Sequence, residues 1–177
     1  STLRDLATDE VNVSTIEDPI EMVEPAFNQM QIQHSIDLDF ATGIKALMRQ
    51  DPDIIMIGEI RDLETAEMAT QAALTGHLVL STLHTNDAPS AITRLMELGI
   101  PPYLIRATVI GVMAQRLVRT LCEECKAPVE IQEEDWKMLT RPWNTPLPKQ
   151  AHKPVGCLAC RNTGYRGRAG VYEIMPL

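Results

Sequence analysis

Four cysteines are the residues whose type and spacing suggest the most specific chemistry. They form two Cys-x-x-Cys pairs, Cys122 with Cys125 and Cys157 with Cys160, and no fifth cysteine is present. Each pair can supply two thiolates from one tight turn, and two such turns can close a tetrahedral site around Zn²⁺. Because the protein would fill all four positions of that site, the spacing predicts structural zinc rather than a catalytic metal.

Two other roles would use the same cysteines. Two disulfides need an oxidising compartment, and the first residues of the chain carry no charged-then-apolar secretory signal. A redox dithiol needs only one pair and a reactive thiol of low pKa. The spacer 126–156 is longer than in common zinc ribbons, so we expect a helix at 133–139 to occupy part of it.

Five carboxylates near two predicted strands form a second cluster: Glu17, Asp18, Glu21, Glu59 and Asp62. Residues 11–16 alternate apolar and polar side chains, and residues 54–57 are apolar on both faces, as in a central parallel strand. In a parallel sheet these acids would meet at one edge, where they could hold Mg²⁺ beside phosphates and orient water for phosphoryl transfer. The alternative is that they cap the helices that follow.

Polar side chains also flank a third predicted strand, residues 78–80. Gly76 and His77 precede it, and residues 81–86 follow it with two threonines, a histidine and an asparagine. Hydroxyl, imidazole and amide groups at the carboxyl end of a strand can bind phosphate oxygens. His84 could instead be an ordinary turn residue, so the sequence leaves both roles open.

The chain lacks the phosphate-binding motif that such clusters would need. A P-loop has the sequence G-x-x-x-x-G-K-[ST], in which backbone amides and the lysine cradle the phosphates. Five lysines are present, at positions 45, 126, 137, 149 and 153, and none is followed by serine or threonine. Since Ser1 also stands in place of an initiator methionine, we expect the chain to be a fragment.

Helical patterns alternate with the three strands. Apolar residues recur at helical spacing over 40–48, and helix-forming residues fill 63–74 and 88–98. We expect a polar loop up to His34 and a longer helix over 103–121. Strands that alternate with helices predict an α/β fold with a parallel sheet, whose ligands bind beyond the carboxyl ends of the strands.

The composition changes at Cys122. Beyond it lie the two cysteine pairs, several prolines and little regular periodicity, which predicts a separate small module. Glycines at 164, 167 and 170 predict tight turns before a final short strand at 171–174. We therefore expect two parts, residues 1–118 and residues 119–177.

Composition excludes several classes of function. Hydrophobic residues make up 45% of the 177-residue chain, which is globular composition, and no stretch approaches the roughly 20 apolar residues that span a bilayer. The net charge of −8 argues against general attraction to nucleic acid or anionic lipid. With only 4% aromatic residues, base stacking on single strands is also disfavoured.

Several segments taken together resemble the motor ATPases of type II secretion and type IV pilus assembly. The similar segments are the family's Asp box at 15–21, its atypical Walker B segment at 48–62, its His box at 76–86, and further stretches at 114–119 and 164–168. The resemblance implies the C-terminal part of a RecA-like ATPase core in residues 1–118, with the Walker A motif upstream. It implies a zinc-binding tetracysteine module in residues 119–177.

The resemblance also implies roles for single side chains. Glu17 would position the attacking water, and Glu59 would hold Mg²⁺ through its water shell. Asp18, Thr82 and His84 would lie around the nucleotide and its magnesium, with Thr82 and His84 sensing the γ-phosphate. Three arginines are candidates for charge contacts within or between subunits, or for ordinary surface ion pairs: Arg49, Arg61 and Arg94.

Members of this family act as hexameric rings on the cytoplasmic side of the inner membrane, where they dock on platform proteins. The resemblance therefore implies that the full-length protein uses ATP with Mg²⁺ to drive assembly of pilins or pseudopilins. Residues 1–177 alone should not hydrolyse ATP, because the P-loop is missing. Residues 83–88 look more like the secretion branch and residues 171–176 more like pilus assembly, so that choice stays open.

A function of another class would also fit, a zinc-stabilised binding module in which the acids are only helix caps. Such a module would need a ligand of its own, and the one basic cluster available for it is Arg161, Arg166 and Arg168. A thiol oxidoreductase is a third reading, and it would leave the segments around Glu59 and His84 without a role.

Overall fold

The computed structural model describes residues 2–143 and 145–177, which form two units. The first contains the residues up to Ala114 together with Glu173–Leu177, and the second is Gln115–Tyr172. The boundary expected after residue 118 lies within β5 (Gly111–Leu121), a strand that runs from the first unit into the second.

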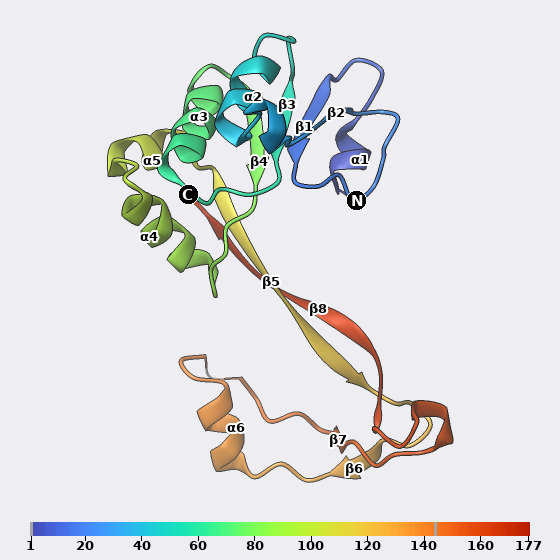
Figure 1. The fold of residues 1–177 in the computed structure, drawn as a ribbon. Helices are drawn as coiled ribbons and strands as arrows, with labels where there is room; N and C mark the ends of the chain where they lie inside the picture. The colour runs from blue at the N-terminus through green and yellow to red at the C-terminus, as the bar shows by residue number, and fades with distance from the viewer. Residues whose placement is uncertain (1, 144) are drawn as a thin grey trace. The chain divides into compact units, whose positions relative to one another are not determined.

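A four-stranded parallel sheet forms the centre of the first unit (Figure 1). Its order is β2-β1-β3-β4, with bounds β1 (Val13–Glu17), β2 (Asn28–Gln31), β3 (Ile54–Ile57) and β4 (Leu78–Ser81). The predicted α/β fold with a parallel sheet is therefore confirmed. The expectation of a loop up to His34 was wrong, because it missed β2. That strand has one apolar residue, Met30, so backbone pairing at the sheet edge forms it rather than a hydrophobic pattern.

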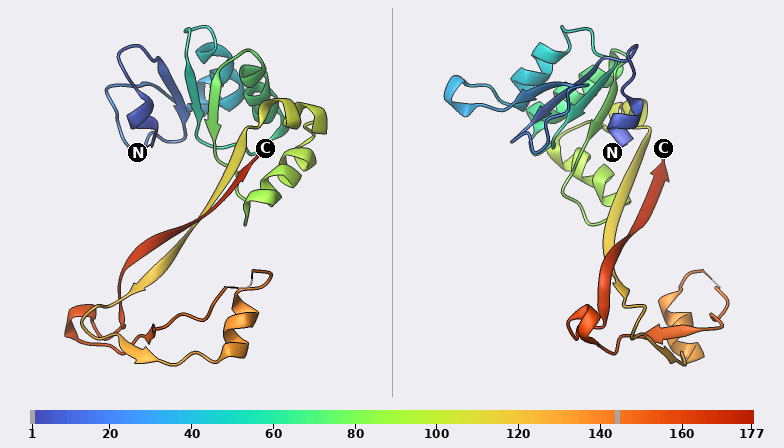
Figure 2. Two further views of the ribbon diagram at one scale, coloured as in Figure 1. Left: turned by 180° about the vertical axis from the view of Figure 1, so that it is seen from behind. Right: turned by 90° about the vertical axis from the view of Figure 1, so that its right-hand side faces the viewer.

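The helices of the first unit are α1 (Thr2–Leu6), α2 (Phe40–Leu47), α3 (Leu63–Leu74), α4 (Ala88–Leu98) and α5 (Pro102–Thr108). Three of them begin with an aspartate cap: Asp39, Asp62 and Asp87 each accept a hydrogen bond of 2.8 Å from the N–H three residues on. Helices α2 and α3 pack on each other and against the sheet (Figure 2). Isoleucines fill this contact, and Ile16, Ile44, Ile55 and Ile57 are completely buried.

The helix expected over 103–121 is wrong in its second half. Helix α5 ends at Thr108, and β5 pairs with β8 (Tyr165–Pro176), which also extends the short strand expected at 171–174. Near one end of the pair Leu177 N donates to Ile110 O at 3.2 Å, and at the other Cys122 N donates to Gly164 O at 3.0 Å, so the strands run antiparallel. Pairing with a strand so distant in sequence overrides the helical periodicity.

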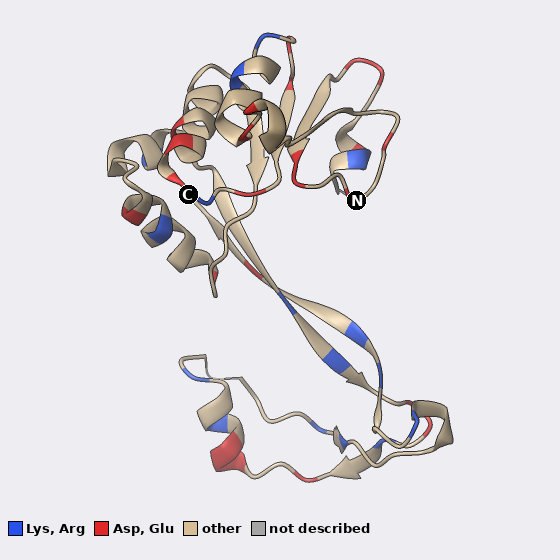
Figure 3. Ribbon diagram, in the orientation of Figure 1, with Lys and Arg blue, Asp and Glu red and all other residues tan. Residues whose placement is uncertain are grey.

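The second unit contains the cysteines and little regular structure. Strands β6 (Ala127–Val129) and β7 (Ala151–Lys153) pair antiparallel, and α6 (Glu133–Leu139) has the bounds expected for a helix in the spacer. Between Gln115 and Tyr172 lie ten Lys and Arg against six Asp and Glu, whereas the first unit has six against eighteen (Figure 3). The acidic character of the chain therefore belongs to the first unit.

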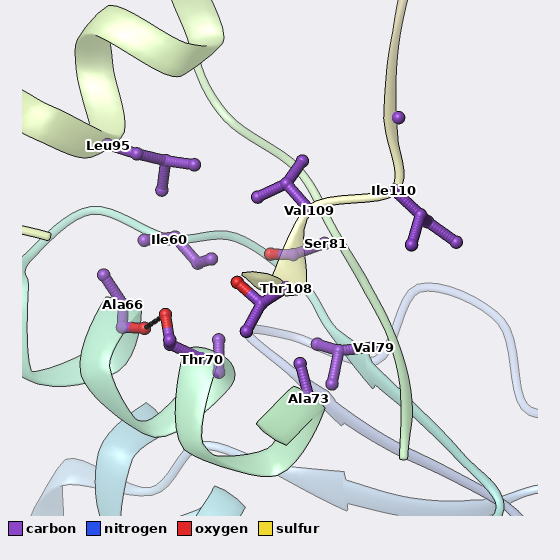
Figure 4. A pocket seen from close by; sticks show the side chains of 12 residues that line it. Ile60, Ala66, Thr70, Ala73, Val79, Ser81, Leu95, Thr108, Val109 and Ile110 are labelled. Atoms are coloured by element: carbon purple, nitrogen blue, oxygen red, sulfur yellow. Dashed lines mark hydrogen bonds between the residues drawn. The ribbon is translucent and has the colours of Figure 1, made fainter. Parts of the chain in front are cut away.

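One hollow in the first unit, of about 140 Å³, lies between α3, β4 and the segment after α5 (Figure 4). Its lining is mostly apolar and carries no titratable side chain. The hydroxyls of Thr70 and Thr108 donate to helix carbonyls, Ala66 O and Leu104 O, each at 2.8 Å. Those two hydroxyls are therefore engaged within the protein, and the hydroxyl of Ser81 is a third polar group in the lining. Among the described residues, no helix is long and apolar enough to cross a membrane.

Candidate functional site

Glu17 and Glu59 stand at the carboxyl ends of two adjacent parallel strands. Glu17 ends β1 and Glu59 follows β3, with Ile16 opposite Ile57 in the ladder. Gly58 N donates to Ile16 O at 2.8 Å, and a Cβ on Gly58 would lie only 3.3 Å from that oxygen and 3.6 Å from Glu17 Cα. The missing side chain lets the two strand ends approach closely.

Glu59 is held through both carboxylate oxygens. Arg61 Nη2 lies 2.5 Å from Oε1, and His84 Nε2 lies 2.9 Å from Oε2. The Arg61 guanidinium lowers the pKa of Glu59 below its ordinary value, burial acts in the opposite direction, and the hydrogen bond with His84 adds to the lowering. Glu59 is therefore a carboxylate at neutral pH, although its side chain is only 13% exposed.

The segment after β4 joins the same edge of the sheet. Thr82 Oγ1 donates to Gly58 O at 2.7 Å, and Ile60 N donates to Thr82 O at 3.0 Å. The His84 side chain is 82% exposed while one ring nitrogen contacts Glu59. Thr82 and His84 thus lie beside the residues that follow β3, and the imidazole is accessible to a ligand from solvent.

Glu17 has different partners. Its Oε1 accepts hydrogen bonds from Thr15 Oγ1 at 2.6 Å and from Gln29 Nε2 at 3.1 Å. Gln29 belongs to β2, and because no sequence pattern predicted that strand, the contact of Gln29 with Glu17 was not predicted either. The parallel register, which places Thr15 opposite Gln29, could not be read from a segment predicted to be a loop.

The remaining carboxylates of the predicted cluster behave differently from these two. Asp62 caps helix α3, which is the alternative role expected for these acids from the sequence. Glu21 is exposed in the loop after β1. Asp18 is exposed and lines a hollow of about 420 Å³, to which Asp39, Arg61 and Asp62 also contribute. Of the five acids, Glu17 and Glu59 therefore stand at adjoining strand ends, Asp62 caps a helix, and Asp18 and Glu21 are exposed after β1.

The three candidate arginines lie in separate places. Arg49 is exposed just after α2. Arg61 pairs with Glu59, as described above. Arg94 lies 3.5 Å from Glu97 on the same helix, a surface pair of a kind worth under about 1 kcal/mol. Contacts of these arginines with another subunit stay a prediction.

The four cysteines come together in the second unit. Their sulfur atoms all lie within 4.8 Å of one another and none forms a disulfide. The Sγ distances are 3.9 Å for Cys122 with Cys157, and 3.8 Å for Cys160 with both Cys125 and Cys157. A tetrahedron with Zn–S bonds of about 2.3 Å has edges of about 3.8 Å. The cluster can therefore hold a tetrahedral metal ion.

Backbone N–H groups around the sulfurs favour the thiolate form that a metal requires. Gly156 N donates to Cys125 Sγ at 3.3 Å, and the N–H groups of Cys157 and Gly164 both donate to Cys160 Sγ at 3.2 Å. Burial opposes ionisation of Cys160, yet these two donors and the neighbouring thiols of Cys157 and Cys125 together lower the pKa of Cys160 to about 6. Burial raises the pKa of Cys125 to about 11. A metal ion binds cysteine as the thiolate, so these N–H donors favour metal binding by the cluster.

Known proteins resemble this chain over its whole length. The family model for the type II/IV secretion system protein matches residues 1–177. The type IV pilus assembly ATPase TfpB of Acinetobacter baylyi is 63% identical over the whole chain, which covers 30% of that protein. The type II secretion system ATPase E of Vibrio cholerae is 50% identical over 98% of the chain and 34% of that protein. The chain thus spans about a third of the length of these relatives.

Solved structures of related ATPases also resemble this chain. The pilus retraction motor PilT with bound ADP superposes with a TM-score of 0.60 at 36% identity, covering 70% of this chain and 39% of that one. The ATPase DotB of Legionella pneumophila gives a TM-score of 0.57 at 33% identity, covering 67% and 36%. Because the family model spans every residue and relatives match nearly the full chain, this protein belongs to the type II/IV secretion system protein family.

Proposed function

We propose that these 177 residues are the part of a motor ATPase that supplies the water-orienting and magnesium-holding carboxylates. The observation that carries the proposal is that Glu17 and Glu59 stand at the carboxyl ends of the adjacent strands β1 and β3, and that His84, which follows β4, contacts Glu59. A P-loop outside these residues would complete the nucleotide site, because the chain has none.

Glu17 and Glu59 have separate tasks in this proposal. Glu17 would accept a hydrogen bond from the attacking water, while Glu59 would help to hold hydrated Mg²⁺. A carboxylate has about four lone-pair sites, so Glu59 can accept these bonds and still contact Arg61 and His84. The magnesium ion itself would neutralise negative charge on the phosphates.

The polar residues around the two acids would contact the nucleotide. Thr82 and His84 would sense the γ-phosphate, because the exposed imidazole beside Glu59 is accessible to a ligand and Thr82 lies next to the residues after β3. Asp18, which is exposed just after β1, would contribute to binding of the nucleotide and its magnesium ion. Arg49, Arg61 and Arg94 provide charge contacts within the site or between subunits.

Zinc bound by Cys122, Cys125, Cys157 and Cys160 would stabilise the second unit. The sulfur spacing and the N–H donors support this role. Residues 1–118 would then act as the ATPase core and residues 119–177 as the tetracysteine module.

In the cell the complete protein would form a homohexamer on the cytoplasmic side of the inner membrane and dock on platform proteins. Its ATP turnover would drive assembly of pilins or pseudopilins. The similarity to type IV pilus assembly and type II secretion ATPases supports this role.

The test measures ATP turnover in a protein that carries these residues together with the P-loop. We expect Glu17→Gln and Glu59→Gln each to lower kcat by about 100-fold or more, because each removes a group that acts in the transition state. Glu21→Gln is the matched control, since Glu21 is an exposed carboxylate in the loop after β1. Normal turnover in both variants would overturn the proposal and favour a zinc-stabilised binding module.

A further inference from the structure

The two carboxylate oxygens of Glu17 have unequal surroundings. Oε1 accepts two hydrogen bonds, from Thr15 Oγ1 at 2.6 Å and from Gln29 Nε2 at 3.1 Å. Within residues 2–143 and 145–177, Oε2 has no hydrogen-bond or ion-pair partner. One oxygen is therefore occupied by the protein, and the other can accept a hydrogen bond from a ligand or water.

The amide of Gln29 can face Glu17 in only one orientation. Its Oε1 accepts a hydrogen bond from Glu24 N at 2.7 Å, while its Nε2 donates to Met22 O at 3.1 Å as well as to Glu17. A flipped amide would place its oxygen against a carboxylate and a carbonyl, and its NH₂ group against an N–H donor. The three contacts therefore fix Nε2 as the group that donates to Glu17.

Thr15 is held just as firmly. It is completely buried in β1, and its side chain lies on the same face of the strand as Glu17 because the two residues are two positions apart. The parallel register of β1 with β2 places Gln29 directly beside Thr15. Thr15 on β1 and Gln29 on β2 thus each donate one hydrogen bond to Oε1 of Glu17.

We propose that Thr15 and Gln29 are positioning residues that hold Glu17 so that Oε2 faces the attacking water. This inference rests on the proposed role of Glu17. A free glutamate side chain samples many rotamers, and the two hydrogen bonds remove that freedom before the substrate binds. The occupied Oε1 is the poorer acceptor for a further hydrogen bond, so water binds at Oε2.

The experiment uses the P-loop-containing protein with the near-isosteric variants Thr15→Val and Gln29→Met. We expect each to lower kcat by about tenfold while KM for ATP stays within about twofold, because orientation of Glu17 matters in the transition state and not for nucleotide binding. Thr15→Ser, which keeps the hydroxyl, should restore kcat. Gln31→Met is the matched control, because Gln31 lies directly opposite Glu17 on β2 but its side chain accepts a hydrogen bond from Ile20 N and donates none to the Glu17 carboxylate.

A double-variant comparison separates positioning from a merely structural role. In a Glu17→Ala background, Thr15→Val and Gln29→Met should cause no further loss of kcat, since they act through Glu17. Losses that add to that of Glu17→Ala would overturn the inference. If Glu17→Gln itself has normal turnover, the proposed function of Glu17 fails; if only Thr15→Val and Gln29→Met have normal turnover, the positioning role alone fails.

A second measurement does not depend on activity or on the folding of the Gln29 variant. In the 177-residue chain, the side-chain amide resonance of Gln29 should shift when Glu17 is replaced by alanine, because the amide loses its acceptor. The same resonance should stay in place in Glu67→Gln, because Glu67 is an exposed carboxylate on α3 with no contact to Gln29. A Gln29 amide that does not respond to Glu17→Ala would show that the contact is absent in solution and would overturn the inference.

Discussion

His84 Nε2 lies 2.9 Å from Glu59 Oε2 and joins the segment after β4 to the segment after β3. The other oxygen of Glu59 contacts Arg61. A carboxylate that follows a buried strand is thus kept ionised by two neighbours, one of which is exposed enough to exchange Glu59 for a ligand. The contact therefore brings the segments after β3 and β4 together at the same edge of the sheet.

Removal of the Arg61 guanidinium should reduce the contribution that ionised Glu59 makes to the stability of the folded chain. The folded-state pKa of Glu59 lies below its ordinary value of 4.5, so its ionisation stabilises the folded chain above about pH 4.5 and this stability is lost as the pH falls lower. Arg61 is the largest cause of that lowering. We therefore expect Arg61→Met to be less stable than wild type near pH 7, and the difference to vanish in acid. Urea unfolding at a series of pH values measures it.

A control variant and an NMR titration test whether the effect of Arg61→Met acts through the charge of Glu59. Arg106→Met, at an exposed position in α5, should show no such pH-dependent difference. An NMR titration of the Glu59 carboxyl should show a higher pKa in Arg61→Met than in wild type. A stability difference that persists unchanged down to pH 2 would mean that Arg61 acts through packing and not through the charge of Glu59.

The cysteine cluster should bind about one zinc ion per chain in protein purified without chelator. Cys122→Ser should lose the metal and loosen the second unit, while the first unit stays folded around its own isoleucine core. Elemental analysis and hydrogen exchange measure the two effects. Glu123→Gln, beside Cys122 but exposed, should retain zinc. Protein without zinc, or with disulfides among the four cysteines, would contradict the prediction.

Gly164 should be intolerant of a side chain. Its φ is +75°, a Cβ would lie 2.5 Å from Pro154 Cβ, and its N–H donates to Cys160 Sγ. We expect Gly164→Ala to destabilise the second unit by about 2 to 4 kcal/mol through backbone strain and steric clash, and to weaken zinc binding. Gly76→Ala is the control, because Gly76 also has a positive φ of +101° but nothing within 4 Å of its Cβ position. Equal losses of stability would show that backbone strain alone acts at Gly164.

Sequence patterns predicted the parts of the fold that depend on residues close together in the chain. The run at 54–57 predicted the central strand because it is apolar on both faces, and the cysteine spacing predicted the cluster of four thiols because the geometry of metal ligands restricts that spacing. Strand β5 was missed because its partner β8 lies far along the chain. Gln29 was missed for the same kind of reason, since only its backbone pairing with Thr15 brings it to Glu17.

The 177-residue chain alone should show negligible ATP hydrolysis. It holds both acids but no P-loop, and positioning of the phosphates is most of the catalysis in phosphoryl transfer. A sensitive phosphate-release assay with and without Mg²⁺ checks this, with the P-loop-containing protein as the positive control. Clear magnesium-dependent turnover by the pure chain would show that its own residues suffice to bind the phosphates.

In the P-loop-containing protein, Glu17 and Glu59 should have different roles, which substitution of each can distinguish. Glu17→Gln should lower turnover while nucleotide affinity changes little, because an interaction with attacking water is made only in the transition state. Glu59→Gln should lower turnover and also weaken the dependence of nucleotide binding on magnesium, because Glu59 would hold the hydrated ion.

Turnover, nucleotide affinity and its magnesium dependence, measured for both variants, distinguish the roles. The contacts favour this division, since Oε2 of Glu17 is open to water while Glu59 is kept ionised by Arg61. Both variants should retain zinc, as neither residue belongs to the second unit. If Glu17→Gln is the variant that loses magnesium dependence, the two roles are exchanged, because each acid ends or follows one of two neighbouring strands and either could reach the ion.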